Sequence, residues 1–202
     1  LKTKAVLSIT PTIVDPDYTY LRLTADVLYD STKTTLSTDS ISAAVRSNIV
    51  TNLENNLGKF DQSFSISKLL TDIDSASSAI DSSAIEVLME KRILPTSIKN
   101  VSYILSFGNS IDHPHDGHKN VVTSNTFKYL DPTDSVTKDV FVGDDGFGKI
   151  SFFTKDGVTD VLVLQNAGTV DYENGIVRID QVQISSPVDS PEIKIFAVAK
   201  NQ

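Results

Sequence analysis

Residues 18–57 read YTYLRLTADVLYDSTKTTLSTDSISAAVRSNIVTNLENNL and contain the two clearest structural patterns in the chain. Apolar and polar residues alternate from Tyr18 to Tyr29, which is typical of a strand with one buried face. Apolar residues then recur at every fourth position and form one stripe along a helix. The residues of that stripe are Ile41, Val45, Ile49, Leu53 and Leu57. The stretch therefore predicts a strand followed by a helix over about 40–57.

The residues on either side of this helix predict where it begins and ends. Thr38, Asp39 or Ser40 is expected to cap its first N–H groups, and Gly58 suits a left-handed C-terminal cap. A short extended link over 60–65 then leads to a second helix that Ser65 caps. The second helix is expected to turn four apolar residues inward: Ile66, Leu69, Leu70 and Ile73.

A second long strand follows a serine-rich turn. Ile85, Val87, Met89 and Ile93 alternate with charged residues, so one face of this strand is expected to be buried. The charged residues on the other face are Glu86, Glu90 and Arg92. Residues 18–97 therefore predict a small α/β unit in the order strand, helix, short strand, helix, strand.

After Pro95 the helical period disappears, and short strand-like runs separated by turn residues replace it. The runs are 98–107, 121–130, 140–142, 149–154, 161–165, 168–172, 175–184 and 193–199. The clearest hairpin turn is Glu173-Asn174-Gly175, because Asn-Gly accepts the positive φ angles of a tight turn. This spacing is typical of a β-sandwich or an open barrel. We therefore predict an α+β chain, with the α/β unit at 18–97 followed by an all-β, sandwich-like domain at 98–202.

Composition excludes several classes of protein. The chain has 202 residues, 18 basic and 26 acidic, and a net charge of −8. It has no cysteine, which excludes a disulfide scaffold, a cysteine nucleophile and a thiolate zinc site. The acidic balance argues against a nucleic-acid partner, and no run approaches the ~18 apolar residues of a membrane span. The first residue is Leu1 and not methionine, so we expect a fragment in which 1–17 lead in from a missing N-terminal region.

All three histidines lie in the sequence DHPHDGH at residues 112–118. His113, His115 and His118 with an aspartate form a set of residue types that binds zinc, and the run is close to the H-x-H-x-D-H signature of metallo-β-lactamase-fold hydrolases. That signature needs an aspartate at 117, where this chain has glycine, and further histidines downstream, which it lacks. We therefore interpret the run as a polar surface loop, with metal binding as the alternative.

A second run, GDDGFGK at residues 143–149, has the G-x-x-x-x-G-K skeleton of a phosphate-binding loop. Ile150 stands where a Ser or Thr would bind magnesium, and Asp144 and Asp145 would repel phosphate. The following residues are strand-like, so no helix N-terminus is available for an anion. We interpret the run as a glycine-rich β-turn. No catalytic constellation or cofactor site is predicted elsewhere, so the chain is not expected to be an enzyme.

Aromatic residues are spread through the β-rich half, and we expect most of them to be core residues. A carbohydrate-stacking platform is the alternative, weakened by the absence of tryptophan. The residues concerned are Phe107, Phe127, Tyr129, Phe141, Phe147, Phe152, Phe153 and Phe196.

Four segments of the chain resemble the baseplate J-like family of contractile-tail phages. They are the strand end VLYD at 27–30, the helix ISAAVRSNI at 41–49, the run LGKFDQSFSISKLLTDID at 57–74 with the strand entry at 80–85, and GTVDYENGIV at 168–177. Within the family, the wedge subunits of T-even-type phages look most similar. The motifs are structural and moderately specific, and the family has no catalytic residues to transfer.

The resemblance implies a structural subunit of the virion tail baseplate, made in the host cytoplasm. Such subunits associate with themselves and with other wedge proteins, form a ring around the tail hub, and couple a change in baseplate shape to sheath contraction. We expect a homodimer, and no metal or other cofactor.

Candidate contact residues are Tyr18, Tyr20 and Leu28, on the strand face opposite the predicted core. The same face packing against the β-rich half is the competing interpretation. A receptor- or glycan-binding module and a metal-dependent hydrolase remain the alternative functions.

Overall fold

The computed structural model describes residues 17–57, 65–95 and 99–200. The described chain is α+β and mostly β: antiparallel strands with two helices inserted between the first two. The elements are β1 (Tyr20–Tyr29), α1 (Thr38–Asn56), α2 (Ile66–Asp74), β2 (Ile80–Ile93), β3 (Val101–Ser106), β4 (Val122–Ser124), β5 (Phe127–Leu130), β6 (Thr137–Asp144), β7 (Lys149–Asp156), β8 (Thr159–Asp171), β9 (Ile176–Val182), β10 (Ile184–Pro187) and β11 (Ile193–Val198).

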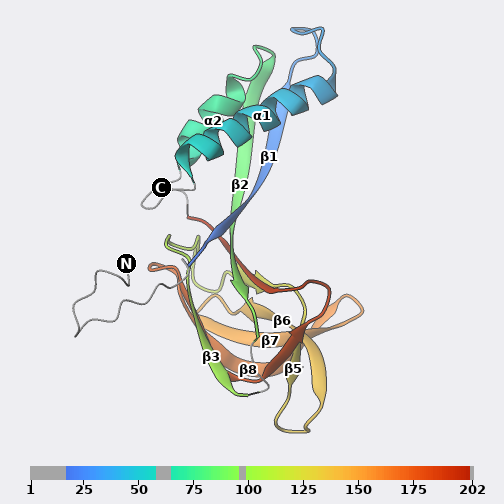
Figure 1. Ribbon diagram of the computed structural model, residues 1–202, viewed down its shortest axis with the longest axis vertical. Helices are drawn as coiled ribbons and strands as arrows, with labels where there is room; N and C mark the ends of the chain where they lie inside the picture. The colour runs from blue at the N-terminus through green and yellow to red at the C-terminus, as the bar shows by residue number, and fades with distance from the viewer. Residues whose placement is uncertain (1–16, 58–64, 96–98, 201–202) are drawn as a thin grey trace, which may run out of the picture.

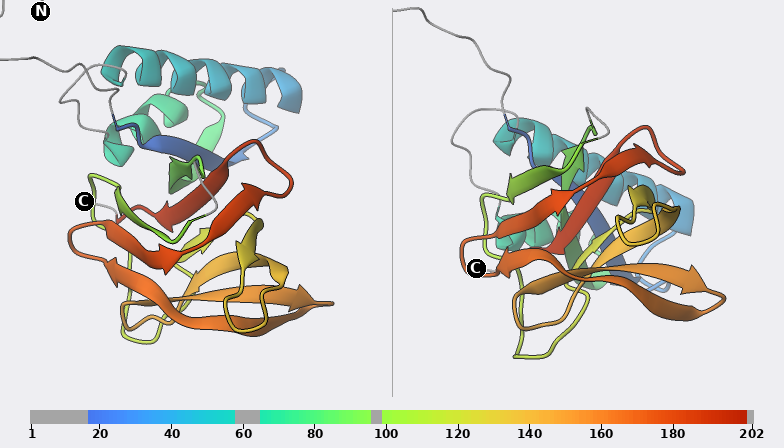
Figure 2. Two further views of the ribbon diagram at one scale, coloured as in Figure 1. Left: turned by 60° about the horizontal axis from the view of Figure 1, so that its bottom comes forward. Right: turned by 90° about the horizontal axis from the view of Figure 1, so that it is seen from below.

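The described strands form one connected sheet in the order β1-β2-β11-β4-β6-β7-β8-β9-β3, with β5 joining β6 to β10 as a side branch. Strand β2 pairs with β11, so the sheet passes from the predicted α/β unit into the β-rich half. The two ends of the path approach each other where the hydroxyl of Thr19 donates to the carbonyl oxygen of Phe107, at 3.1 Å. Figure 2 shows the lower strands curving around their core. This order does not confirm the predicted sandwich-like packing.

Strands β1 and β2 are joined through α1 and α2 and form a long antiparallel pair that rises above the rest of the sheet (Figure 1). We call this pair the β1–β2 hairpin. Their register runs from Tyr20 opposite Glu90 to Tyr29 opposite Ile80. Exposure alternates strictly along β1, which confirms the strand predicted from its sequence. Helices α1 and α2 lie side by side over the inner face of this hairpin, where Leu23, Ala25 and Val27 are half-buried.

Both predicted helices are confirmed, with one correction to a cap. Helix α1 begins at Thr38, and the hydroxyl of Ser37 accepts from the backbone N–H of Ser40. The predicted cap at 38–40 was wrong because the helix starts about one turn before its first apolar residue. Ser65 caps α2 as predicted, and Leu69 and Ile73 are fully buried. The predicted link at 60–65 falls largely, and the Gly58 cap entirely, outside the described residues.

Two hydrophobic clusters of unequal size stabilise the described residues. The small one lies between the helices and the hairpin and has four buried residues: Ile41, Val45, Leu69 and Ile73. The large one fills the β-rich part and has 23 buried residues. Strand β2 is half-buried at Ile85 beside the small cluster and fully buried at Val87 and Met89 in the large one. This single 14-residue strand therefore connects the helical layer to the main core.

Several strand boundaries in the β-rich half differ from the prediction. The run at 121–130 is two strands, and the runs at 161–165 and 168–172 are one continuous strand, β8. The turn at 173–175 does join two strands, but only Gly175 has a positive φ, at +63°. Asn174 instead donates from its backbone and side chain to the carboxylate of Asp171. The loop is therefore longer than a two-residue Asn-Gly turn.

The prediction that most of the eight aromatic residues are core residues is confirmed for half of them: four are buried, three are half-buried and one is exposed. Phe127 and Phe152 are fully buried with their rings edge to face at 5.3 Å, and Tyr129 packs on Phe152 in the same way at 5.4 Å. Phe147 is the exposed one, at 69%. The apolar pattern alone did not separate it from its buried neighbours.

Candidate interaction surface and its charged junction

The candidate contact residues predicted from sequence share one face of the β1–β2 hairpin but lie toward its two ends, Tyr18 and Tyr20 at one and Leu28 at the other. We define this outer face by Tyr20, Arg22 and Leu28 of β1 with Glu90 and Arg92 of β2. Residues directly opposite in an antiparallel pair share a face, so Tyr20 and Glu90 lie on the same side. Tyr18, just before β1, is 60% exposed, Tyr20 is 39% exposed and Leu28 is 66% exposed. No described segment covers these side chains as the helices cover the inner face.

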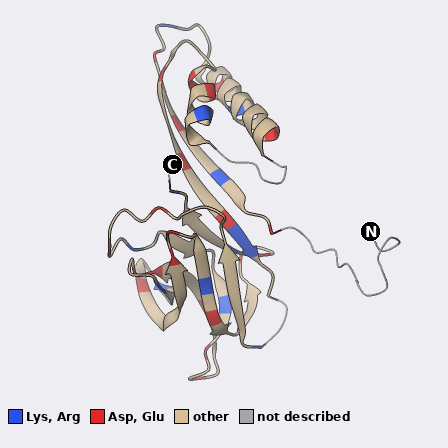
Figure 3. Ribbon diagram, turned by 90° about the vertical axis from the view of Figure 1, so that its left-hand side faces the viewer, with Lys and Arg blue, Asp and Glu red and all other residues tan. Residues whose placement is uncertain are grey.

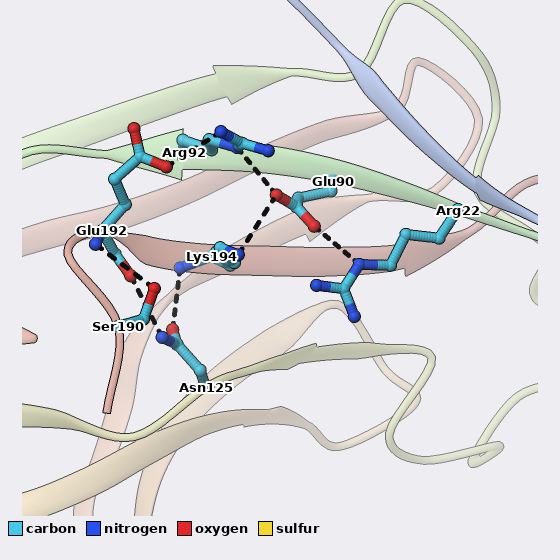
Figure 4. Close-up of polar contacts among 7 residues, drawn as sticks. All are labelled: Arg22, Glu90, Arg92, Asn125, Ser190, Glu192 and Lys194. Atoms are coloured by element: carbon cyan, nitrogen blue, oxygen red, sulfur yellow. Dashed lines mark hydrogen bonds and ion pairs between the residues drawn. The ribbon is translucent and has the colours of Figure 1, made fainter. Parts of the chain in front are cut away.

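A buried carboxylate lies at the lower end of this face, where the hairpin meets β11. Glu90 is 2% exposed, and its two oxygens accept from Nε of Arg22 and Nε of Arg92, both at 2.8 Å (Figure 4). Nζ of Lys194, on β11, lies 4.0 Å away. A buried charge is stable only when it is paired and hydrogen-bonded, and these contacts satisfy both conditions. We call this group the charged junction.

The cations of the charged junction also stack on aromatic rings. The guanidinium of Arg92 lies 3.8 Å from the centre of the Tyr20 ring, and that of Arg22 lies 4.7 Å from the centre of Phe196. Each arginine thus covers a ring and pairs with Glu90 at once, which a planar guanidinium does better than an ammonium group. The contacts join β1, β2 and β11 across the outer face.

The charged junction carries a small positive excess within an acidic protein. Arg22, Arg92 and Lys194 carry three positive charges and Glu90 carries one negative charge. Glu192 adjoins the junction by pairing with Arg92 at 3.0 Å, which lowers the local excess to +1. Figure 3 shows that acidic and basic residues are otherwise mixed over the hairpin and the lower strands on the side it displays. The outer face therefore offers local charged groups and not a broad field of one sign.

A second buried charge lies on the opposite face of β2. Lys91 is 3% exposed, and its Nζ donates to the carboxylate of Asp17 at 2.8 Å. Sequence reasoning missed both this pair and the burial of Glu90. The available signal was the run Glu90-Lys91-Arg92, because side chains alternate between the two faces of a strand and three consecutive charges must place at least one on the core face.

The structure does not bring the three histidines to one point. His113 stacks on Tyr172 with the ring centres 4.0 Å apart, and its Nε2 lies 3.0 Å from the carbonyl oxygen of Gly146. His115 and His118 are exposed and meet each other edge to face at 5.2 Å. Within the part of the chain that the structure describes, no group of three or more His, Cys, Asp or Glu could hold a metal ion. The geometry therefore gives the hydrolase hypothesis no support.

The glycine-rich run at 143–149 is a turn whose own carboxylates bind its backbone. Asp145 accepts from the N–H groups of Phe147 and Lys149, at 2.8 and 3.0 Å. Asp144 is buried and accepts from the N–H groups of Val122 and Gly146 and from the hydroxyl of Tyr172. The donors that would hold a phosphate in a phosphate-binding loop are thus already paired with carboxylates.

Tyr172 gives this loop a measurable pH dependence. Burial, and then the hydrogen bond to Asp144, raise the pKa of Tyr172 above its usual value of 10.0. A raised pKa in the folded state means that stability is intact below pH 10 and falls as the pH rises through 10, because the unfolded chain ionises first. Burial also raises the pKa values of Tyr103 and Tyr129, so the loss is shared.

We expect Tyr172→Phe to lose less stability than the unsubstituted protein between pH 9 and pH 11, since phenylalanine cannot ionise. Urea unfolding followed by circular dichroism across this range measures the difference. A parallel measurement at pH 7 separates the constant cost of the lost hydrogen bond from the pH-dependent part. Equal slopes for the two proteins above pH 10 would contradict the assignment.

A comparison with known protein families gives a match within the first half of the chain. The model of the family described as baseplate structural protein gp6, C-terminal domain III, matches residues 17–92. No curated protein matches the chain. The matched segment holds β1, α1, α2 and nearly all of β2, so it contains the outer face and most of the charged junction.

The match does not name the baseplate J-like family, and that narrower assignment stays a prediction. Within the described residues, neither helix combines the length and apolar character that crossing a membrane requires. Residues 17–92 are thus similar to C-terminal domain III of the baseplate structural protein gp6, which supports a structural protein of a contractile-tail phage baseplate, located in the virion and assembling with other baseplate proteins.

Proposed function

We propose that this protein is a wedge-type subunit of the tail baseplate that self-associates as a homodimer and contacts other wedge proteins. In the assembled particle these contacts build a ring around the tail hub and couple a change in baseplate shape to sheath contraction. The protein is made in the host cytoplasm and acts through its surfaces and not as an enzyme.

The outer face of the β1–β2 hairpin is the observation that supports this proposal most. Tyr18, Tyr20 and Leu28 are large apolar or aromatic side chains that stay exposed, and they lie inside the segment similar to the baseplate family. Tyrosine and arginine are the residue types most often found at the energetic centres of protein interfaces. Beneath them, the charged junction fixes the two arginines and the three strands that carry them.

Electron microscopy of the chain co-expressed with other baseplate proteins tests the proposal. We expect wedge- or ring-shaped particles with the unsubstituted chain and their loss with a Tyr18→Ala, Leu28→Ala double variant. Val158→Ala is the matched control, because Val158 is 98% exposed at a hairpin tip outside the matched segment. Failure of the unsubstituted chain to enter any particle with its partners would refute the assembly role.

A receptor- or glycan-binding module is the second candidate, and exposed Phe147 is the observation that favours it. Phe147, His113 and Tyr172 line an open pocket with Asp116 and Glu173 at its sides. An exposed ring beside carboxylates is a suitable surface for stacking and hydrogen-bonding a sugar. We expect a glycan array to detect binding by the unsubstituted chain, and Phe147→Ala to abolish that binding. Retained binding in Phe147→Ala would exclude this pocket.

A further inference from the structure

Strand β1 is one end of the sheet, and among the described residues it pairs only with β2. It has ten residues, no proline and only two charges, Arg22 and Asp26. Proteins usually protect an edge strand of this length with proline, a bulge or several charges, because its free N–H and C=O groups otherwise pair with another strand. The outer edge of β1 is therefore a site at which a further strand can add to the sheet.

The sequence of β1 is symmetric in its chemistry about Thr24. When two copies of β1 run antiparallel with Thr24 opposite Thr24, Arg22 of each copy lies opposite Asp26 of the other. Tyr20 then lies opposite Leu28, and Leu21 opposite Val27. Opposite charges and apolar pairs facing each other across antiparallel strands stabilise the pairing.

This register also keeps the two faces of the hairpin separate. In this register the numbers of two opposite residues add up to 48, so both are even or both are odd. Even-numbered residues of β1 lie on the outer face and odd-numbered ones on the inner face, so each residue meets one from its own face. The inner residues Leu21, Leu23, Ala25 and Val27 are all half-buried and meet one another, while Arg22, Thr24 and Asp26 are exposed and meet one another. A slip by one residue would place inner side chains opposite outer ones across the whole strand.

The charges disfavour the other registers that preserve the faces. Moving the centre by one residue in either direction leaves Arg22 and Asp26 opposite uncharged residues. Moving it by two residues places Arg22 opposite Arg22 or Asp26 opposite Asp26, and like charges directly opposite are destabilising. The register centred on Thr24 is thus the one that pairs both charges.

The two charged side chains are solvent-accessible. Arg22 is 53% exposed and keeps unused donors on its terminal nitrogens, but its guanidinium lies over Phe196 of β11, so it turns toward the free edge of β1 when it pairs with Asp26 of a second copy (Figure 4). Asp26 is exposed and forms no ion pair with any residue that the structure describes. Each copy therefore presents one cation and one free carboxylate at mirrored positions.

We propose that β1 of one copy pairs edge to edge with β1 of a second copy, antiparallel and centred on Thr24, so that the sheet continues through the dimer. The inference rests on the self-association proposed above and adds the surface and the register. Nine residues, Tyr20 to Leu28, take part from each chain, over a length of about 30 Å. The helices stay on one side of the extended sheet and the outer faces lie on the other.

Cysteine cross-linking tests the register, because the chain contains no cysteine of its own. Thr24→Cys places two sulfurs across the symmetry axis, where Cα atoms of paired residues lie about 4.5–5.5 Å apart, within the range of a disulfide. Leu28→Cys is the matched control on the same strand and face, but in this register it lies about 27 Å from its copy. Mild oxidation should convert most of Thr24→Cys to a covalent dimer and little of Leu28→Cys.

A charge experiment on the same residue gives an independent readout. Thr24→Lys and Thr24→Glu should each sediment as monomers, since like charges then meet at the axis, and an equimolar mixture should form a heterodimer. Sedimentation of the unsubstituted chain separates this inference from the proposal on which it rests. A dimer whose Thr24→Cys variant cross-links no faster than Leu28→Cys overturns the edge pairing alone. A monomer at high concentration overturns both the pairing and the homodimer.

Discussion

Replacing Glu90 with alanine is expected to lower the free energy of unfolding by about 3 kcal/mol, because removing one partner of a buried ion pair leaves the others uncompensated. Arg22 would lose its ion-pair partner, and Lys194 would lose the carboxylate that lies 4.0 Å from its Nζ. Arg92 would keep only its ion pair with Glu192, at 3.0 Å. We take the lower end of the usual range because Arg22 and Arg92 are partly exposed and water can solvate them. For a chain of this size, about 3 kcal/mol lowers Tm by about 6–12 °C.

Glu86→Ala is the matched control for this experiment. Glu86 lies on the same face of the same strand, four residues away, but is exposed. Its removal should change stability by no more than about 0.5 kcal/mol. Glu90→Gln keeps the shape and the hydrogen-bonding oxygen but loses the charge, so it should fall between the two. Thermal unfolding followed by circular dichroism measures all three, and a Tm for Glu90→Ala close to that of Glu86→Ala would show that the carboxylate is not important for stability.

Phe152→Ala is the second substitution with a large expected effect. Phe152 is fully buried in β7, between Val142 on β6 and Leu164 on β8, and its ring contacts Phe127 and Tyr129 edge to face. Truncating such a residue removes its buried area and leaves a cavity, at a cost of about 3–5 kcal/mol. Urea unfolding should show a lower midpoint with an unchanged slope, because the surface exposed on unfolding stays nearly the same.

Phe147→Ala provides the comparison, because it deletes the same ring from an exposed site in the turn between β6 and β7. The change in stability should stay within about 0.5 kcal/mol. Both substitutions replace phenylalanine with alanine, so the difference between their urea unfolding midpoints reflects the burial of the ring. Equal midpoints would mean that the Phe127–Phe152–Tyr129 cluster does not hold the β-rich part together.

The local pattern was sufficient for the helices and strands of residues 17–57 and 65–95. Alternation in β1, the four-residue period in α1 and the serine cap of α2 each arise from contacts within a few residues, and each was predicted correctly. The cap of α1 was misplaced by a single residue from the predicted range, since any of several polar residues before an apolar stripe can serve. The boundaries of the later strands were less predictable. The run 121–130, for example, divides into β4, which pairs with β11, and β5, which pairs with β10, and the break depends on this change of partner.

Some residues of the candidate site were predicted from the sequence and others were not. Tyr18, Tyr20 and Leu28 were predicted as exposed contact residues from alternation, and they are exposed. The histidine loop was interpreted as a polar surface loop from its spacing, and the structure places His113 on Tyr172 and His115 beside His118. The charged junction was not predicted, because its residues come from positions 22, 90, 92 and 194. No local pattern relates residues so far apart in the chain.

The sequence by itself determined the α+β class, the two long strands with one apolar face each, the two helices between them, and the symmetric chemistry of β1 about Thr24, since these follow from side-chain periods of two and about four. Only the tertiary structure decided that β2 pairs with β11, that Glu90 and Lys91 are buried on opposite faces, and that β1 is left as an edge. The reason is that strand order depends on long-range hydrogen bonding and on which core excludes water. Neither quantity is present in any short stretch of sequence.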